Sequence, residues 1–360
     1  MLRVFRIYLI GDDMKKLNFS FIFVMIFLIF FFSFPREISN GVSEGFNVCK
    51  NVIVPSLFPF LIMSSFVVKS GLSDYENKIT RFISEKIFRL PTATLPVILM
   101  SFIGGFPVGI RMAGELYNQG KINSKSAERL SLFCVNAGPA YVINAVGMMM
   151  LENKKAGVLI FISLTLASIF TAIFSGFFYK ETANKNIKNS LRKNFSDSLV
   201  ESVSDSVFSM LSICAWILFV SAFLPLIDKI SWEFFRDFLK AFSEVTSGSI
   251  IFSEKYPAYF LAGVIGFNGL CVHCQLLPSL NKMKVRLSVF FISRILSAVL
   301  STLIAKLLFE IFPCDIQTFS TLANTVSGGL SVSIPALCSL FFMCVLLILD
   351  LSLDRCKKIC

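Results

Sequence analysis

The sequence has few charged side chains and a single histidine. Only 16% of its 360 residues are Asp, Glu, Lys or Arg, whereas a soluble domain carries about 25%. Hydrophobic residues make up 55% of the chain and include 41 phenylalanines. Several apolar runs approach or exceed the roughly 20 residues that cross a bilayer. The scarcity of charge excludes a soluble domain and predicts an all-α polytopic membrane protein.

The sequence also lacks the motifs of common enzymes. It contains no HExxH, no GxSxG, no Walker loop and no paired carboxylates on one predicted face. Cys271 and Cys274 flank His273, but a fourth zinc ligand is missing at any recognisable spacing. The pair lies in an apolar run rather than beside a thioredoxin-like βαβ pattern, so a redox role is not expected. We therefore predict no enzymatic activity, no metal and no cofactor.

The net charge of +11 does not indicate a nucleic-acid partner. The Lys and Arg residues lie in short connections between apolar runs, as the positive-inside rule expects, and no basic face is interleaved with aromatic residues. The ten cysteines are scattered, many within apolar runs, where free cysteine behaves as a small hydrophobic residue. The expected partners are the lipid bilayer and a small molecule, and a homo-oligomer is compatible with the sequence.

The order of apolar and basic segments predicts two halves with about eight transmembrane or re-entrant helices. Lys15 and Lys16 precede a first span at 17–34, which places the N-terminus in the cytoplasm, and 36–50 suit an outside loop. Later helical runs are expected at 155–179, 205–227, 231–243, 256–279, 286–311 and 335–353. The predicted organisation is a membrane anchor (1–35), a first half (36–180), a basic cytoplasmic linker (181–204), a second half (205–353) and a basic tail (354–360).

Two apolar runs of the first half are interrupted in the middle. The run 92–117 is broken at Gly104–Gly109 and the run 130–151 at Asn136–Pro139.

Residues 75–90 alternate apolar and basic positions, which is typical of an interfacial amphipathic helix on the cytoplasmic side. If 71–91 and 180–204 are both cytoplasmic, an even number of crossings separates them. Three apolar runs lie between, so one broken run is expected to be re-entrant or split.

The two halves resemble each other weakly. Arg129-Leu-Ser matches Arg286-Leu-Ser, and Ile103-Gly104 aligns with Ile265-Gly266, which puts Arg111 opposite His273. Paired interrupted segments at corresponding positions indicate the central site of a transporter. The short match leaves chance as the alternative to an internal duplication.

Several motifs occur at the breaks and near them. The first half has Gly105-Phe-Pro-Val-Gly109, Ala127-Glu-Arg-Leu130 and Asn136-Ala-Gly-Pro139, and the second half has Glu244-Val-Thr246-Ser-Gly248 and Gly266-Phe-Asn-Gly-Leu-Cys-Val-His-Cys-Gln275. These motifs resemble those of the YlbJ-type (SpoVV-like) sporulation integral membrane proteins of the nucleoside-recognition (Gate) class. The resemblance spans about residues 45–310. It implies a multi-pass protein that moves dipicolinic acid, an aromatic dicarboxylate, across the outer forespore membrane during sporulation. The alternatives are transport of a nucleoside or another small solute, and a non-transporting role in spore envelope assembly.

The candidate substrate-binding residues lie at the breaks in the apolar runs, and each also has a purely structural interpretation. The glycines could serve only helix packing, although a broken helix also exposes backbone N–H groups to an anion. Arg111 needs a partner inside the membrane, either Glu115 or a substrate carboxylate. His273 could simply be satisfied by a neighbouring helix or could carry a proton, and Glu244 with Thr246 could form only a capped loop. The predicted set is Gly105, Pro107, Gly109, Arg111, Asn136, Glu244, Thr246, Asn268, His273 and Gln275.

Overall fold

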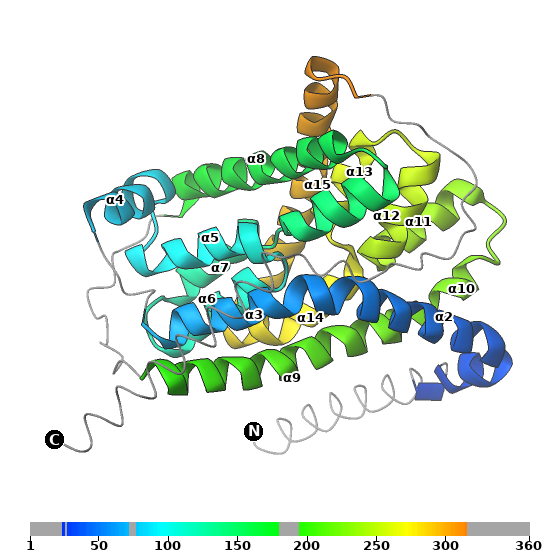
Figure 1. The fold of residues 1–360 in the computed structure, drawn as a ribbon, viewed down its shortest axis with the longest axis horizontal. Helices are drawn as coiled ribbons and strands as arrows, with labels where there is room; N and C mark the ends of the chain where they lie inside the picture. Colours follow the sequence, from blue (N-terminus) through cyan, green and yellow to red (C-terminus); the bar gives the residue numbers. More distant parts are fainter. Residues whose placement is uncertain (1–23, 26, 72–76, 180–193, 315–360) are drawn as a thin grey trace, which may run out of the picture.

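The computed structural model describes residues 24–25, 27–71, 77–179 and 194–314, and within them the chain is helical with no strand. Figure 1 shows long helices packed side by side, with shorter broken helices between them. Of the predicted first span at 17–34, the structure describes residues 24–25 and 27–34, and the run 335–353 and the basic tail lie outside the described residues. The helices are α2 (Pro35–Val48), η1 (Cys49–Ile53), α3 (Val54–Lys69), α4 (Lys78–Arg81), η3 (Phe82–Phe88), η4 (Thr92–Thr94), α5 (Leu95–Gly104), α6 (Val108–Asn118), α7 (Ser124–Phe133), η5 (Ala140–Met150), α8 (Lys154–Phe178), α9 (Phe195–Ser221), α10 (Leu224–Ile227), α11 (Glu233–Ser243), α12 (Val245–Lys255), α13 (Tyr259–Phe267), α14 (Gly269–Lys282) and α15 (Leu287–Ile311).

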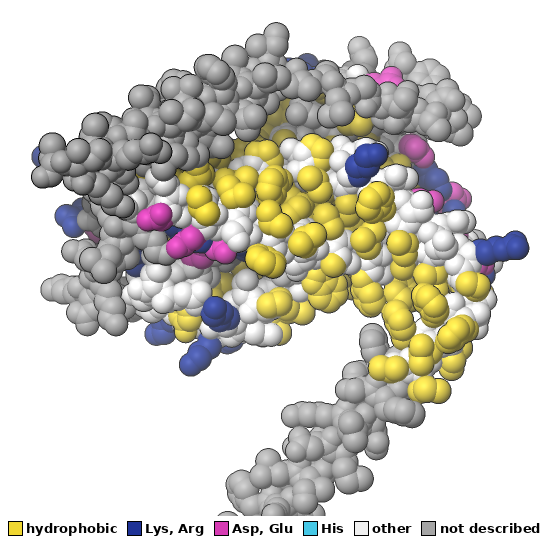
Figure 2. Space-filling view, turned by 60° about the horizontal axis from the view of Figure 1, so that its bottom comes forward, with side chains coloured by type: hydrophobic (Ala, Val, Ile, Leu, Met, Phe, Trp, Pro, Cys, Tyr) yellow, Lys and Arg dark blue, Asp and Glu magenta, His cyan; other side chains and the backbone are white. Residues whose placement is uncertain are grey.

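Four helical stretches of the described residues are long and apolar enough to cross a membrane: Lys154–Phe178, Phe195–Ile227, Tyr259–Lys282 and Leu287–Ile311. Two bent helix pairs raise the number to as many as six. The outer faces are apolar; on α9, for example, Phe208 is 70% and Leu211 61% exposed. Figure 2 shows such a face, on which hydrophobic side chains form a broad band with few charges. These features confirm the all-α polytopic membrane fold.

The predicted amphipathic helix at 75–90 is confirmed as α4 followed by η3. The helix Lys78–Phe88 is bent by 89° from the helix Thr92–Gly104 that follows it. Its apolar residues Ile79, Phe82 and Ile87 are exposed, whereas Phe88 is buried against the protein. A nearly perpendicular helix with an exposed apolar side suits the plane of a membrane surface.

One of the two segments expected in the cytoplasm, 71–91, contacts the last turn of α8. Arg89, just after η3, donates from Nη1 to the carbonyl oxygen of Gly176 at 3.2 Å, and its guanidinium lies 4.5 Å from the ring centre of Phe177. Residues 176 and 177 are in the last turn of α8, directly before the predicted linker. The number of membrane crossings between the two basic segments stays a prediction.

Three boundaries differ from the sequence-based expectation. Residues 36–50 form most of α2 and the start of η1, so the expected outside loop is wrong. The cause is tertiary packing, because a Cβ at Gly41 would lie 2.1 Å from the carbonyl oxygen of Ser221 on α9. Helix α9 begins at Phe195, inside the expected linker, and α12 was not anticipated because Ser, Thr and Gly interrupt its apolar pattern.

Candidate functional site

The two breaks of the first half meet in the middle of the protein. Gly105 ends α5 with φ of 76°, a left-handed conformation that favours glycine. A Cβ there would lie 2.7 Å from the backbone nitrogen of Gly138, in the other break. Helix α6 then packs back on α5, since a Cβ at Gly109 would lie 2.7 Å from Cβ of Ser101. Glycines 105, 109 and 138 therefore allow two broken helices to touch through their backbones.

The break in the second half lies against the same region. Asn268 separates α13 from α14 with φ of 74°. Its Nδ2 donates to the carbonyl oxygen of Val135 at 3.1 Å, within the break that ends α7. Arg294 of α15 donates to the same carbonyl at 2.9 Å and also to the carbonyl of Leu132. The second half thus supplies the donors that satisfy backbone carbonyls freed where α7 stops.

A small, partly open cavity of about 30 Å³ has Phe106 and Gly138, from the two breaks of the first half, in its wall. A cavity of this size holds a water molecule or two, because one water needs about 10–15 Å³ of such volume. Its walls come from both halves, and no Lys, Arg or His is among its lining residues. They are Ile53, Leu57, Phe106, Gly138, Tyr141, Ile213, Ile217, Glu244, Val245, Thr246, Cys271, Val272 and Gln275.

The polar side chains of the cavity wall include both hydrogen-bond acceptors and donors. Glu244 caps α12: its Oε1 accepts from the Thr246 backbone N–H at 2.9 Å and its Oε2 from the Ser247 N–H at 2.6 Å. The Tyr141 hydroxyl donates to Oγ of Ser249 at 3.1 Å. The hydroxyl of Thr246 is buried and has no hydrogen-bond partner among the described residues. The site can accept and donate hydrogen bonds around an aromatic side chain, Phe106.

The structure brings together only part of the predicted site. Glu244, Thr246 and Gln275 line the cavity, and Gln275 donates from Nε2 to Sγ of Cys271 at 3.4 Å. Gly105, Pro107 and Gly109 build the backbone around it without lining it. Arg111 is outside the lining, and its Nη2 lies 3.5 Å from the carbonyl oxygen of Asp205 on α9. The Glu115 carboxylate oxygen Oε2 is buried without a hydrogen-bond partner among the described residues.

Asn136, Asn268 and His273 make contacts within the protein rather than facing the cavity. Asn136 donates from Nδ2 to the Phe133 carbonyl at 2.9 Å and accepts from the Ser168 hydroxyl. His273 is 1% exposed, and its Nε2 lies 2.9 Å from the carbonyl oxygen of Phe267. The rings of Phe267, Phe290 and Phe291 surround its imidazole. The Nδ1 of His273 and the Oδ1 of Asn268 are buried and have no hydrogen-bond partner among the described residues, so a role of these residues in substrate binding stays a prediction.

Two buried arginines, Arg129 and Arg294, were not among the residues predicted from the sequence to matter for the site. Arg129 is fully buried and donates to the carbonyls of Phe88, Arg89 and Ala172. Arg294 is 1% exposed and holds the break after α7. The sequence does contain a signal for Arg294, because a charged residue in an apolar run of 25 residues requires buried partners. Tyr141 carried no such signal.

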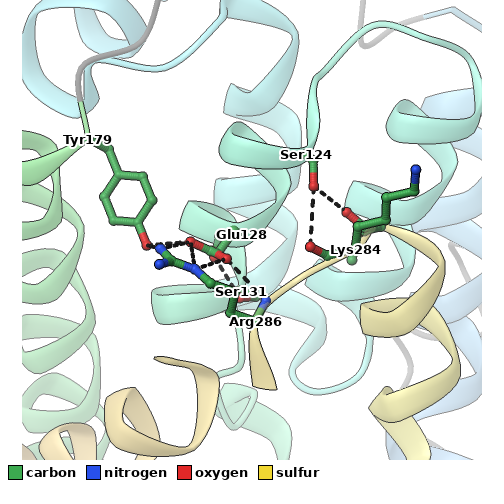
Figure 3. A network of polar contacts seen from close by, with 7 residues as sticks. Ser124, Glu128, Ser131, Tyr179, Lys284 and Arg286 are labelled. Atoms are coloured by element: carbon green, nitrogen blue, oxygen red, sulfur yellow. Dashed lines mark hydrogen bonds and ion pairs between the residues drawn. The ribbon is translucent and has the colours of Figure 1, made fainter. Parts of the chain in front are cut away.

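A second polar cluster joins the halves away from the cavity (Figure 3). Arg286, which precedes α15, donates from Nη2 to Oε1 of Glu128 at 2.7 Å and from Nε to Oε2 at 3.0 Å. The Tyr179 hydroxyl donates to the same carboxylate at 2.6 Å. These contacts hold the pKa of Glu128 at about 2, well below its ordinary value, and the Arg286 pairing is the largest cause. Burial, followed by hydrogen bonding to Glu128, raises the pKa of Tyr179 to about 12.

The lowered pKa of Glu128 predicts a pH-dependent contribution to stability. A depressed pKa stabilises the folded state above the unfolded-state pKa of about 4.3 and loses that effect as the pH falls toward the folded value. In detergent at neutral pH, the unfolding temperature of wild type should therefore be higher than that of Glu128→Gln. This difference should disappear between about pH 4 and 2. A gap that stays constant over this range would contradict an ionised Glu128 paired with Arg286.

The fold and the site define an α-helical multi-pass membrane protein with broken helices around a central cavity. The chain is similar to the sporulation integral membrane protein YlbJ of Bacillus subtilis (strain 168), with 23% identity over 325 aligned residues. The alignment covers 77% of this chain and 79% of the relative. This similarity confirms the resemblance to the YlbJ-type family. No family model matches the sequence, and no solved structure matches it, so the link to the Gate class stays a prediction.

Proposed function

We propose that this protein transports a small solute across a membrane, with the central cavity as the substrate site. The observation that carries the proposal is that Phe106 and Gly138, from the two breaks of the first half, and Glu244, between α11 and α12, line one mainly apolar cavity with a few polar groups. Broken helices are tolerated within a membrane where they are buried in protein or line a cavity, and transporter sites form at such interruptions. At about 30 Å³ the cavity is too small for a carboxylate or nucleoside, so we interpret this conformation as occluded.

Dipicolinic acid is the first substrate to test, because the resemblance implies it, and the outer forespore membrane is then the proposed location. The cavity adds a constraint, since it presents the Glu244 carboxylate and no basic lining residue. A dicarboxylate would have to enter with protons or cations that offset this charge. A nucleoside is the second candidate, because Tyr141, Thr246 and Gln275 offer neutral hydrogen-bonding groups beside Phe106.

The sharpest variant is Thr246→Val, which removes a hydroxyl that has no hydrogen-bond partner among the described residues. We expect uptake into proteoliposomes to fall about tenfold, the equivalent of one lost hydrogen bond of about 1.4 kcal/mol. The unfolding temperature should be unchanged, because valine has nearly the same shape. Uptake of radiolabelled dipicolinate and of uridine would be compared in the same vesicles.

Thr171→Val is the matched control. Thr171 is equally buried, but its hydroxyl donates to the Ala167 carbonyl of its own helix at 2.9 Å and does not line the cavity. Uptake should therefore stay near the wild-type rate. If both variants reduce uptake equally, Thr246 has no special contact with substrate. Absence of uptake of either solute by wild type would favour the role in membrane assembly.

A further inference from the structure

A second and much larger pocket opens at the contact between the two halves. It lies between the start of α7, the end of α8 and the turn from α14 to α15, and its volume is about 560 Å³. Pockets for small ligands typically measure about 300–1,000 Å³. The pocket is separate from the central cavity, because the two share no lining residue. It is therefore large enough to hold a ligand of its own.

The lining of this pocket carries an excess of positive charge. Three of its residues are basic (Lys125, Lys284 and Arg286), and one is acidic (Glu128), which leaves 3 − 1 = 2 positive charges. Arg286 and Tyr179 already engage both oxygens of the Glu128 carboxylate. Neither lysine forms an ion pair with a carboxylate among the described residues. The two ammonium groups thus remain available to an anion.

The turn that carries Lys284 is fixed rather than freely moving on the surface. The Ser124 hydroxyl donates to the carbonyl oxygen of Met283 at 2.7 Å and contacts that of Lys284 at 3.4 Å. Figure 3 shows this contact beside the Glu128–Arg286 pair. Lys284 itself has φ of 58°, a left-handed conformation that is unfavourable for a side chain with a Cβ. The hydrogen bonds from Ser124 to the carbonyls of residues 283 and 284 therefore keep the Lys284 backbone in this unusual conformation beside the pocket.

We propose that this pocket binds an anionic group bearing carboxylate or phosphate oxygens. Two lysines with no acidic partner can bind such oxygens by charge-assisted hydrogen bonds. The same chemistry is offered by a free anion and by an acidic phospholipid headgroup, for which basic pockets between membrane helices are known sites. The inference does not require that the protein transports a solute, because it concerns only binding outside the central cavity.

The test measures binding to the purified full chain and to the double variant Lys125→Gln/Lys284→Gln. The probes are inorganic phosphate and succinate in detergent, and nanodiscs of phosphatidylcholine with or without phosphatidylglycerol, followed by the rise in unfolding temperature. Wild type should show a saturable rise that weakens with added salt, and the double variant should need at least tenfold more probe. A response to the free anions assigns a solute site, and a response confined to phosphatidylglycerol assigns a headgroup site.

Lys282→Gln is the matched control, since Lys282 is an exposed lysine at the end of α14, two residues before Lys284, and does not line the pocket. The affinity of the Lys282→Gln variant for the anionic probes should stay within twofold of wild type. If Lys282→Gln weakens binding as much as a lysine of the pocket does, the effect is only diffuse surface charge and the site does not exist. The same conclusion follows if the double variant binds all probes as wild type does.

Discussion

Replacing Gly109 with alanine is expected to destabilise the protein and abolish the transport that we propose. The new Cβ would lie 2.3 Å from the carbonyl oxygen of Cys134 and 2.7 Å from Cβ of Ser101. The first of these is a backbone atom in the break after α7, so it cannot move aside as a flexible side chain would. Overpacking of this kind typically costs about 1–3 kcal/mol. The unfolding temperature in detergent should drop clearly. Uptake should be lost because the two breaks can no longer touch.

Gly114→Ala on the same helix is the control for this prediction. A Cβ at Gly114 would meet no atom within 4 Å. Alanine also favours helix over glycine by about 0.5–1 kcal/mol. Stability should therefore stay the same or rise slightly. Equal losses in both variants would mean that α6 tolerates no side chain anywhere, and the specific contact between Gly109 and the break would lose its support.

The position of the breaks could be predicted from the sequence, because glycine and proline interrupt apolar runs by simple local physics. Gly105 ends α5 and Pro139 precedes η5, as the composition indicated. The interfacial helix at 78–88 was predictable for the same reason, since its apolar and basic residues repeat with helical spacing. Local sequence patterns therefore predict most of the fold.

The residues that face the cavity could not be predicted with the same success. Arg111 and His273 were chosen because polar residues in apolar runs are unusual, but that signal does not distinguish a partner in the protein from a substrate. His273 meets three phenylalanine rings and a carbonyl, whereas Glu244 and Thr246 reach the cavity. The difference depends on which helices pack together, for example α14 against α6 and α9, and no short-range pattern contains that information.

Replacing Arg294 with methionine is expected to have the other large effect. The guanidinium is buried and donates to the carbonyls of Leu132 and Val135, where α7 ends inside the protein. Exchanging a whole buried ion pair for apolar residues can be neutral or stabilising, but here only the donor is removed and its acceptors remain. An unsatisfied buried carbonyl costs about 1–3 kcal/mol. Asn268 still donates to the carbonyl of Val135, so the free energy of unfolding should fall by about 2–4 kcal/mol rather than by the cost of two fully unsatisfied carbonyls.

The comparison that tests this prediction is Lys306→Met on the same helix, where the lysine is exposed. It removes a positive charge and adds the same side chain, so it should leave the unfolding temperature in detergent almost unchanged. Arg294→Lys should recover only part of the loss, because a single ammonium lacks the fork that reaches two carbonyls at once. If Arg294→Met is as stable as wild type, the break after α7 does not depend on the second half. If instead it unfolds early while Lys306→Met does not, one arginine of the second half determines the geometry of a break in the first.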